Sequence, residues 1–446
     1  MMLAHAHARF GLGARPGDLD EKIDPRDWVE RQLAAAPALP AALTGLPGSR
    51  DNLAAVLEAR RAGDAGATQK IGAMVREQFL PQFIREAALR TRVAVTSDTP
   101  LVERLVQFWS NHFTVSVVNR PIVVGIANAY EREAIRPHLL GRFRDLLEAA
   151  VLHPAMLAYL DNAQSIGPNS LAGKRRERGL NENLGRELLE LHTLGVKGGY
   201  SQADVTEMAR VLTGWTYGGG RLNDTPGRTA FIGRMHEPGA KSILGKRYAE
   251  EGENEVRRVL DDLARHPATA QHIATKLVRH FIADAPPEAA VKEVAAVFRK
   301  SDGDLRLTLR AVAARPEAWE PPLAKVKTPN ELAISAWRAL GSAPAEDRAL
   351  VGQLRALEQA PFGAPSPAGW SDEGSQWVGP EAMVKRVEWA TQMARRVPGG
   401  GRDPSDIADA VLGDLLRADT RQSIARAASA KEGFTLLLAA PEFQRR

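Results

Sequence analysis

Apolar residues recur every three or four positions along most of this chain of 446 residues. In the segment 100–113, PLVERLVQFWSNHF, this spacing places one apolar stripe on a helix, formed by Leu101, Leu105, Phe108, Trp109 and His112. Comparable spacing predicts helices through most of the remaining sequence. The sequence lacks the alternating strands and helices of βαβ units, which disfavours a doubly wound parallel sheet. The sequence therefore predicts a mostly α protein with a large multi-helical globular fold.

Residues 229–248, TAFIGRMHEPGAKSILGKRY, are the exception to the helical spacing. They contain two short β-prone runs on either side of a Glu-Pro-Gly turn, which predicts one small β-hairpin. The chain is longer than one compact core usually is. A single helical domain over 1–446 and two packed helical lobes, 1–200 and 201–446, are both consistent with this length.

The composition, 44% hydrophobic and 25% charged, is that of an ordinary globular protein. No stretch approaches the about 18 uninterrupted apolar residues of a membrane span. The absence of cysteine excludes disulfides, cysteine-ligated zinc and a cysteine nucleophile. The net charge of +5 mildly favours anionic partners. Dense basic runs occur only at 174–178 and 394–402, without interleaved aromatic residues, which disfavours nucleic-acid binding.

The first residues, MMLAHAHARFGLGARPGD, have no basic segment followed by an apolar segment. They therefore predict no secretory signal, and as given the sequence predicts a cytoplasmic protein. An exported protein would require a translation start upstream of this one.

Residues 179–200, GLNENLGRELLELHTLGVKGGY, concentrate polar side chains in one expected helix. On a regular α-helix four leucines share the core face: Leu180, Leu184, Leu188 and Leu191. Asn183, Glu187 and Glu190 then form a polar stripe on the flank of that face, and His192 lies on the opposite flank. Glu187 and His192 are therefore not expected to bind one metal ion together.

Two interpretations of this stripe remain open. Arg186 lies four residues from both Glu182 and Glu190, a spacing typical of a salt-bridged helix surface or a structural network. Leu189, however, lies on the other side of the helix, and a helix that is apolar on both sides is expected to be central. Its carboxylates would then be buried, and buried carboxylates are paired or have shifted pKa values. The stripe is either a structural polar network or the wall of a functional cleft.

Several segments identify a family by resemblance. FWSNHFTVS, HPAMLAYLDNAQSIGPNS, GLNENLGRELLELHTLGVKGGYSQADVTEMARVLTGW and the ending LLLAAPEFQRR resemble the bacterial family DUF1800, in the family's order and over nearly the whole chain. The resemblance implies membership without a mechanism, and it supplies no catalytic residues. Members of the family are often exported and often encoded beside a DUF1501 protein, so the resemblance implies a DUF1501-type partner as one hypothesis.

The leading hypothesis is a hydrolase or lyase with a carboxylate/histidine cleft, acting on a polymeric, glycan-like substrate, and the basic net charge extends this class to anionic glycans. Glu187 and Glu190 are the acid/base candidates, assisted by His112 or His192, because glycosidic cleavage needs one protonated and one ionised carboxyl group. Seven further residues are the substrate-binding candidates: Asn111, Asp161, Asn162, Asn183, Arg186, Trp215 and His236. We expect these groups to converge on one concavity.

Two alternatives remain. The protein is a non-enzymatic helical scaffold that binds a partner protein, or His112, Glu187 and His236 bind a metal ion from separate elements. The sequence contains no local metal-binding motif, and it leaves the identity of any cofactor open. His272, Lys276 and His280 share one helix face; a lysine between two histidines argues against a metal ion there and predicts a solvated basic face.

Overall fold

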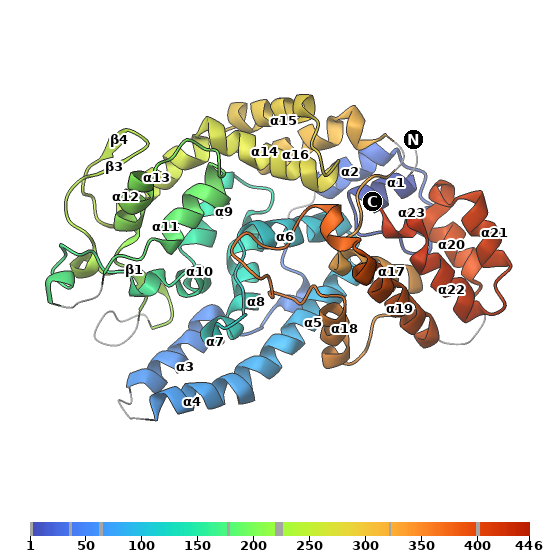
Figure 1. The fold of residues 1–446 in the computed structure, drawn as a ribbon, viewed down its shortest axis with the longest axis horizontal. Helices are drawn as coiled ribbons and strands as arrows, with labels where there is room; N and C mark the ends of the chain where they lie inside the picture. The colour runs from blue at the N-terminus through green and yellow to red at the C-terminus, as the bar shows by residue number, and fades with distance from the viewer. Residues whose placement is uncertain are drawn as a thin grey trace.

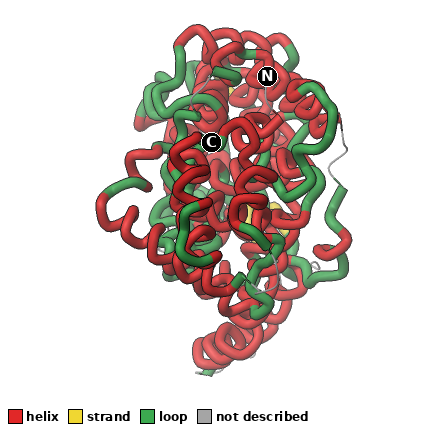
Figure 2. The backbone as a smooth tube through the Cα atoms, turned by 90° about the vertical axis from the view of Figure 1, so that its right-hand side faces the viewer, coloured by secondary structure: helices red, strands yellow, loops and turns green. Residues whose placement is uncertain are grey.

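A computed structural model gives the fold, and it describes residues 3–34, 38–61, 66–175, 179–218, 226–320, 323–397 and 402–446. The mostly α fold class is confirmed. Helix makes up most of the backbone in Figure 2, and strands are confined to small patches. No helix in these described ranges combines the length and the apolar character needed to cross a membrane.

The helices of the first half are α1 (Leu3–Arg9), α2 (Pro25–Ala34), α3 (Ser49–Arg61), α4 (Ala67–Met74), α5 (Leu80–Thr96), α6 (Pro100–His112), α7 (Pro121–Val124), α8 (Ala127–Tyr130), α9 (Phe143–Val151), α10 (Pro154–Tyr159), α11 (Asn183–Glu187) and α12 (Gln202–Leu212). Three π-helical segments continue helices of this half: η2 (Val75–Phe79), η3 (Glu131–Ile135) and η7 (Leu188–Thr193).

The helices of the second half are α13 (Glu253–Arg265), α14 (Pro267–Phe281), α15 (Glu288–Lys300), α16 (Leu305–Ala314), α17 (Pro329–Leu340), α18 (Asp347–Ala356), α19 (Pro380–Arg396), α20 (Pro404–Leu412), α21 (Ala418–Ala425), α22 (Ala430–Ala439) and α23 (Pro441–Gln444). In Figure 1, α14, α15 and α16 form one edge of the molecule, α3 and α4 project from the opposite edge, and α20–α23 form one end.

Several helices begin where the sequence offers both a cap and a proline. Thr328 accepts a hydrogen bond from the Glu331 amide, and Glu331 accepts one from the Thr328 amide, so both orphan donors at the start of α17 are satisfied. His153 and His266 cap α10 and α14 through Nδ1, and each is followed by a proline in the first helical position.

The β structure differs in detail from the expected single hairpin. β2 (Thr229–Phe231) pairs antiparallel with β1 (Trp215–Tyr217), which precedes it in sequence. β3 (Lys241–Ile243) pairs with β4 (Lys246–Tyr248) as a separate hairpin. The Glu-Pro-Gly turn therefore separates the two sheets and does not join their strands. Within the described residues, each sheet has two strands.

The buried apolar side chains form two clusters. The first draws on residues from Ala6 to Trp319 and includes members before and after residue 200. The second combines α17–α22 with Leu12, Ala14 and the inner face of α5. The helix α5 packs between the two clusters, because it contacts both α6 and α17. The lobe boundary near residue 200 stays a prediction.

The helix expected at 180–194 is regular only to Glu187. Beyond it, η7 is π-helical, and the Leu194 amide donates to the Leu189 carbonyl, five residues earlier. A π segment has more residues per turn than an α-helix and so rotates the following side chains around the axis. His192, expected on a flank, is therefore buried with Leu188 and Leu189.

Candidate functional site

One polar cleft lies where α6, the start of α17 and the end of α14 meet the segment 359–377. We call residues 359–377 the crossing segment, because it passes across α6 between α18 and α19 (Figure 1). The cleft is lined by Arg90, Gln107, Phe108, Ser110, Asn111, Thr114, Val115, His280, Thr328, Asn330, Glu331, Gln359, Ala360, Pro361, Phe362, Ala364, Trp370, Ser371 and Asp372. Its volume is about 100 Å³, several times the ~10–15 Å³ that one water needs.

The α6 wall of the cleft follows from helical spacing. Gln107, Phe108, Ser110 and Asn111 lie at positions i, i+1, i+3 and i+4, so all four reach the same side of the helix. The remaining face of α6 carries Leu105 and other core residues, which fix the helix in the first apolar cluster. The polar end of the motif FWSNHF is thus held rigidly at the edge of the core.

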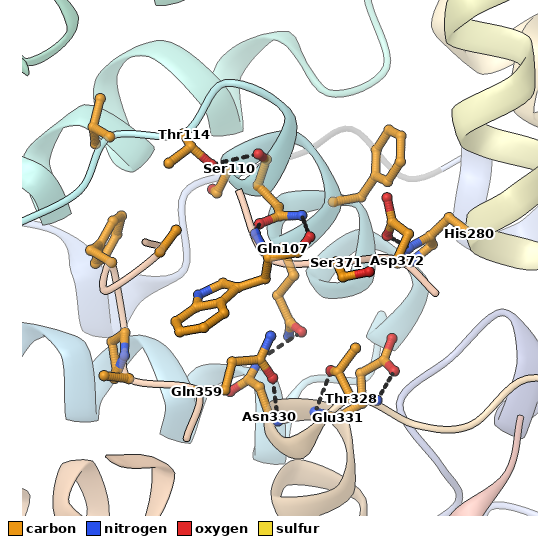
Figure 3. Close-up of a pocket in the computed structure, with 18 of the residues that line it drawn as sticks. Gln107, Ser110, Thr114, His280, Thr328, Asn330, Glu331, Gln359, Ser371 and Asp372 are labelled. Carbon is orange, nitrogen blue, oxygen red and sulfur yellow. Dashed lines mark hydrogen bonds and ion pairs between the residues drawn. The ribbon is translucent and has the colours of Figure 1, made fainter. Parts of the chain in front are cut away.

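A histidine and a carboxylate form a pair at one side of the cleft, as Figure 3 shows. His280 Nδ1 donates to Asp372 Oδ1 over 3.2 Å. An ionised carboxylate only accepts, so this bond places the imidazole proton on Nδ1 and leaves Nε2 as an acceptor. His280 Nε2 is buried and has no hydrogen-bond partner among the described residues. The ring of Phe108 lies 5.0 Å from the His280 ring, centroid to centroid, and covers this side of the cleft.

The environment keeps this pair in the neutral-histidine, ionised-aspartate state. Burial lowers the pKa of His280 to about 4, and the charge of Arg446 acts in the same direction. Burial opposes ionisation of Asp372, but the hydrogen bond from His280 and the charges of Lys276 and Lys325 outweigh it and lower the pKa of that carboxyl to about 2. At neutral pH His280 is therefore an uncharged base beside an anion.

The other carboxylate of the cleft is already neutralised. Glu331 Oε1 accepts from Arg104 Nη1 at 2.6 Å, and Glu331 Oε2 accepts from Arg446 Nε at 2.9 Å. These two guanidinium groups hold the pKa of Glu331 well below its usual range, although burial opposes ionisation. Among the described residues, the one arginine that lines the cleft is Arg90, and it is likewise engaged, by Glu131 at 2.5 Å. Every charged group that lines the cleft therefore has an opposite charge or a hydrogen-bond partner.

Uncharged amides occupy the middle of the cleft. Asn330 Nδ2 donates to Gln107 Oε1 at 2.9 Å, and the Asn330 amide donates to Gln359 Oε1 at 2.8 Å (Figure 3). The Nε2 groups of Gln107 and Gln359 have no protein acceptor within the described part of the chain. Trp370 is half-buried, and its ring centroid lies 6.1 Å from that of Trp377. The cleft thus combines a base, amide donors and an aromatic wall.

Comparison with known proteins places the chain in a family. The model of the family described as "Protein of unknown function (DUF1800)" matches residues 5–445. The chain belongs to the DUF1800 family. No curated protein and no solved structure matches it.

Of the residues predicted from sequence, Asn111 lines the cleft, whereas His112 and His192 lie behind it in the core. His112 Nε2 is 3.2 Å from the His192 carbonyl oxygen, and the two rings are 6.1 Å apart. Both are buried among aromatic side chains such as Phe113. The third ring of this group, His272, lies 6.0 Å from His112. No described carboxylate forms a hydrogen bond or an ion pair with His112 or His192.

The expected burial of the polar stripe is wrong for Asn183, which is exposed, and Glu187 and Glu190 are only half-buried. Arg186 does not join the stripe: it reaches back to Glu182 Oε2 at 3.1 Å and to Gln202 Oε1 at 3.0 Å. Glu190 accepts instead from the Tyr200 hydroxyl at 2.8 Å. Burial and the charge of Glu190 raise the pKa of Glu187. None of these residues lines the cleft.

The remaining predicted residues anchor other parts of the fold. Asp161 pairs with Arg120 at 2.9 Å. Asn162 Nδ2 donates to the carbonyls of Leu212 and Trp215, each at 3.1 Å, and so joins η5 (Asn162–Gln164) to β1. The Trp215 ring is buried, with the Arg257 guanidinium 5.7 Å from its centroid.

His236 belongs to a separate buried network. Its Nε2 lies 3.2 Å from Glu255 Oε2 and 3.1 Å from Lys241 Nζ. His236 therefore belongs to a network that contains neither His112 nor Glu187, and the convergence of these residues on one concavity stays a prediction. Within the described ranges, no group of three or more histidine or carboxylate side chains is arranged to hold a metal ion.

The basic face expected on α14 is wrong: His280 is buried, and His272 and Lys276 are half-buried. Helical spacing correctly aligned the three residues but did not reveal their partners: His280 meets Asp372 of the crossing segment, and His272 Nε2 lies 3.0 Å from the Leu191 carbonyl oxygen of η7. Asp372 follows His280 by 92 residues, so no local pattern links the two. The nearest sequence signal was the run of aromatic and glycine residues at 362–377.

Proposed function

We propose that this protein is a hydrolase that cleaves an ester bond on a neutral, hydroxyl-rich, glycan-like substrate bound in the cleft. The observation that carries the proposal is the pair His280–Asp372: a buried histidine whose Nδ1 is held by a carboxylate and whose Nε2 has no described partner. This is the arrangement that a general base needs, because its proton acceptor is oriented, uncharged and free.

In the proposed reaction, His280 Nε2 takes a proton from water as the water oxygen attacks the ester carbonyl carbon. Asp372 stabilises the imidazolium ion that forms, as a carboxylate does in a hydrolytic triad. The free amide groups of Gln107 and Gln359 are the donors available to the carbonyl oxygen as it becomes negative. When the C–O bond breaks, the imidazolium returns its proton to the leaving alkoxide, so the products are a carboxylic acid and an alcohol.

The charges of the cleft support a neutral substrate. Arg90, which lines the cleft, is paired with Glu131, so it offers no free counter-charge to an anionic sugar. Amide groups and hydroxyls beside Trp370 suit hydroxyl-rich rings, which stack on aromatic faces. Glycosidic cleavage by two carboxyl groups is less well supported, because Asp372 and Glu331 both have lowered pKa values and neither is a proton donor.

The proposal is tested by acetate release from acetylated xylan and from para-nitrophenyl acetate. We expect the wild-type protein to release acetate, and His280→Gln and Asp372→Asn to lower the rate by about 100- to 10,000-fold, the usual contribution of a general base. Glu187→Gln is the matched control, because this carboxyl lies outside the cleft, and it should retain the wild-type rate. Urea unfolding checks that each variant is folded. An unchanged rate in His280→Gln, or no release from either substrate by the wild type, contradicts the proposal.

A second function, binding of a partner protein, is favoured by one observation. Four apolar side chains lie exposed on and just before α19: Val378, Met383, Val384 and Val387. Exposed apolar groups gathered on one helix mark protein-binding surfaces. A DUF1501-type protein is the partner we propose here. Val384→Asp should abolish co-purification of the two proteins, whereas His280→Gln should not. Co-purification of the partner with the Val384→Asp variant contradicts this proposal.

A further inference from the structure

The crossing segment is attached to the end of α6 by one side chain. The Trp370 amide donates to Asn111 Oδ1 at 2.7 Å, and Asn111 Nδ2 donates to the Trp370 carbonyl at 2.8 Å. This two-way exchange with one main-chain residue is the pattern by which paired residues hold neighbouring antiparallel strands. The carboxamide of Asn111 therefore acts as a one-residue strand partner for the crossing segment.

The approach at this point is close enough to require glycine. Gly369 has a φ of +82°, and a Cβ there would lie 2.5 Å from the Asn111 carbonyl oxygen and 2.6 Å from Asn111 Oδ1. The same Cβ would lie 2.8 Å from Thr114 Oγ1, which donates to the Asn111 carbonyl at 2.6 Å. A side chain at 369 would force the crossing segment away from α6.

The hydrogen bonds between Asn111 and Trp370 constrain the backbone path of the next two residues. The chain is fixed at Trp370 by Asn111 and again at Asp372, whose carbonyl accepts from Lys325 Nζ at 2.8 Å. Between these two points the backbone has little freedom, so the Asp372 side chain is directed at His280. Trp370, in the same span, is held as a wall of the cleft.

We infer that Asn111 is a positioning residue that holds Trp370 and Asp372 in place. One N–H group and one oxygen lone pair of its carboxamide are engaged by the main chain of Trp370, so the two residues fix each other's orientation. The positioning role is a property of the folded chain; its effect on catalysis rests on the proposed function.

Hydrogen exchange of the crossing segment tests the inference without any ligand. Asn111→Leu removes both hydrogen bonds at similar side-chain size, and we expect the Trp370 amide to exchange about tenfold faster or more. Asn162→Leu is the matched control, because Asn162 also donates to two main-chain carbonyls but lies outside the cleft. It should leave exchange at 365–372 unchanged. Gly369→Ala, which leaves α6 intact, should accelerate exchange as Asn111→Leu does.

A second readout follows His280 itself, by nuclear magnetic resonance of labelled histidine. When the crossing segment loosens, water reaches His280, and its pKa should rise from about 4 towards the ordinary 6.5 in Asn111→Leu and Gly369→Ala but not in Asn162→Leu. Unchanged exchange at 365–372 together with an unchanged His280 titration in both cleft variants overturns the inference.

Acetate release separates this inference from the proposed function. If exchange and titration respond as expected while the wild type releases no acetate, the proposed function fails and the positioning role stands. If the wild type is active and Asn111→Leu keeps the full rate although its crossing segment exchanges faster, the positioning of Asp372 does not affect the reaction. That result contradicts the catalytic part of the inference.

Discussion

Mild acid should destabilise this protein strongly, because five of its histidines are neutral when folded. Burial is the largest cause in each case; it lowers the pKa to about 4 for His5, His7, His272 and His280 and to about 3 for His192, from the ordinary 6.5. Because the folded pKa values lie below the unfolded ones, the unfolded chain binds more protons between these limits. The contribution of these histidines to the free energy of unfolding is therefore fully present above pH 6.5, and it is lost as the pH falls below this value.

The magnitude follows from linkage. At about pH 5.5 an unfolded imidazole is about nine-tenths protonated and the folded one is almost uncharged, so each histidine lowers the free energy of unfolding by about 1.3 kcal/mol relative to about pH 7.5. Five such groups give on the order of 6 kcal/mol. That is comparable with the whole folding stability of many proteins, about 5–15 kcal/mol.

Urea unfolding at these two pH values measures the effect, and one variant isolates a single group. Neither ring nitrogen of His192 has a hydrogen-bond partner among the described residues, and its ring lies 5.2 Å from Phe113. His192→Leu should therefore remain folded and should reduce the difference between the two pH values by about 1.3 kcal/mol. The control Phe113→Leu should lower stability equally at both. Equal stability of the wild type at both pH values, or an undiminished pH effect in His192→Leu, shows that the neutral histidines do not cause the pH dependence of stability.

Two further predictions concern stability near neutral pH, each measured by urea unfolding. Glu331→Gln removes the one carboxylate between Arg104 and Arg446 and should cost about 3–5 kcal/mol, because it leaves buried guanidinium groups uncompensated; a loss below about 1 kcal/mol contradicts this role. Leu188→Ala should cost about 2–5 kcal/mol, because this side chain is fully buried in η7; a near-neutral change means that the segment is not part of the core.

Local sequence patterns correctly predicted the helices and caps that depend on residues close together in the sequence. The apolar stripe of α6 is buried as expected, with Leu101, Leu105, Phe108, Trp109 and His112 all inside. Caps such as Ser201–Asp204 also follow from adjacent residues, and the structure forms this capping box at the start of α12. The periodic spacing of side chains therefore predicted the fold class and most helices.

The site depends on contacts between distant residues, which local patterns do not contain. Asn111 and Trp370 are 259 residues apart, and the bonds between them follow from the path of the crossing segment. The polar stripe was predicted wrongly for a local reason: the π-helical turn after Glu187 changes the register of the following side chains, and a regular helical projection does not show this turn. The pair Arg186–Glu182, in contrast, follows the i,i+4 spacing noted in the sequence.

The most direct test of the proposed function is where a substrate analogue binds. A crystal of His280→Gln soaked with an acetylated methyl xyloside places the ester without cleaving it. We expect electron density in the cleft between Trp370 and position 280, with the ester carbonyl near the amide groups of Gln107 and Gln359. Density beside Glu187 and Glu190 instead, or an empty cleft in a protein whose wild type releases acetate, would contradict it.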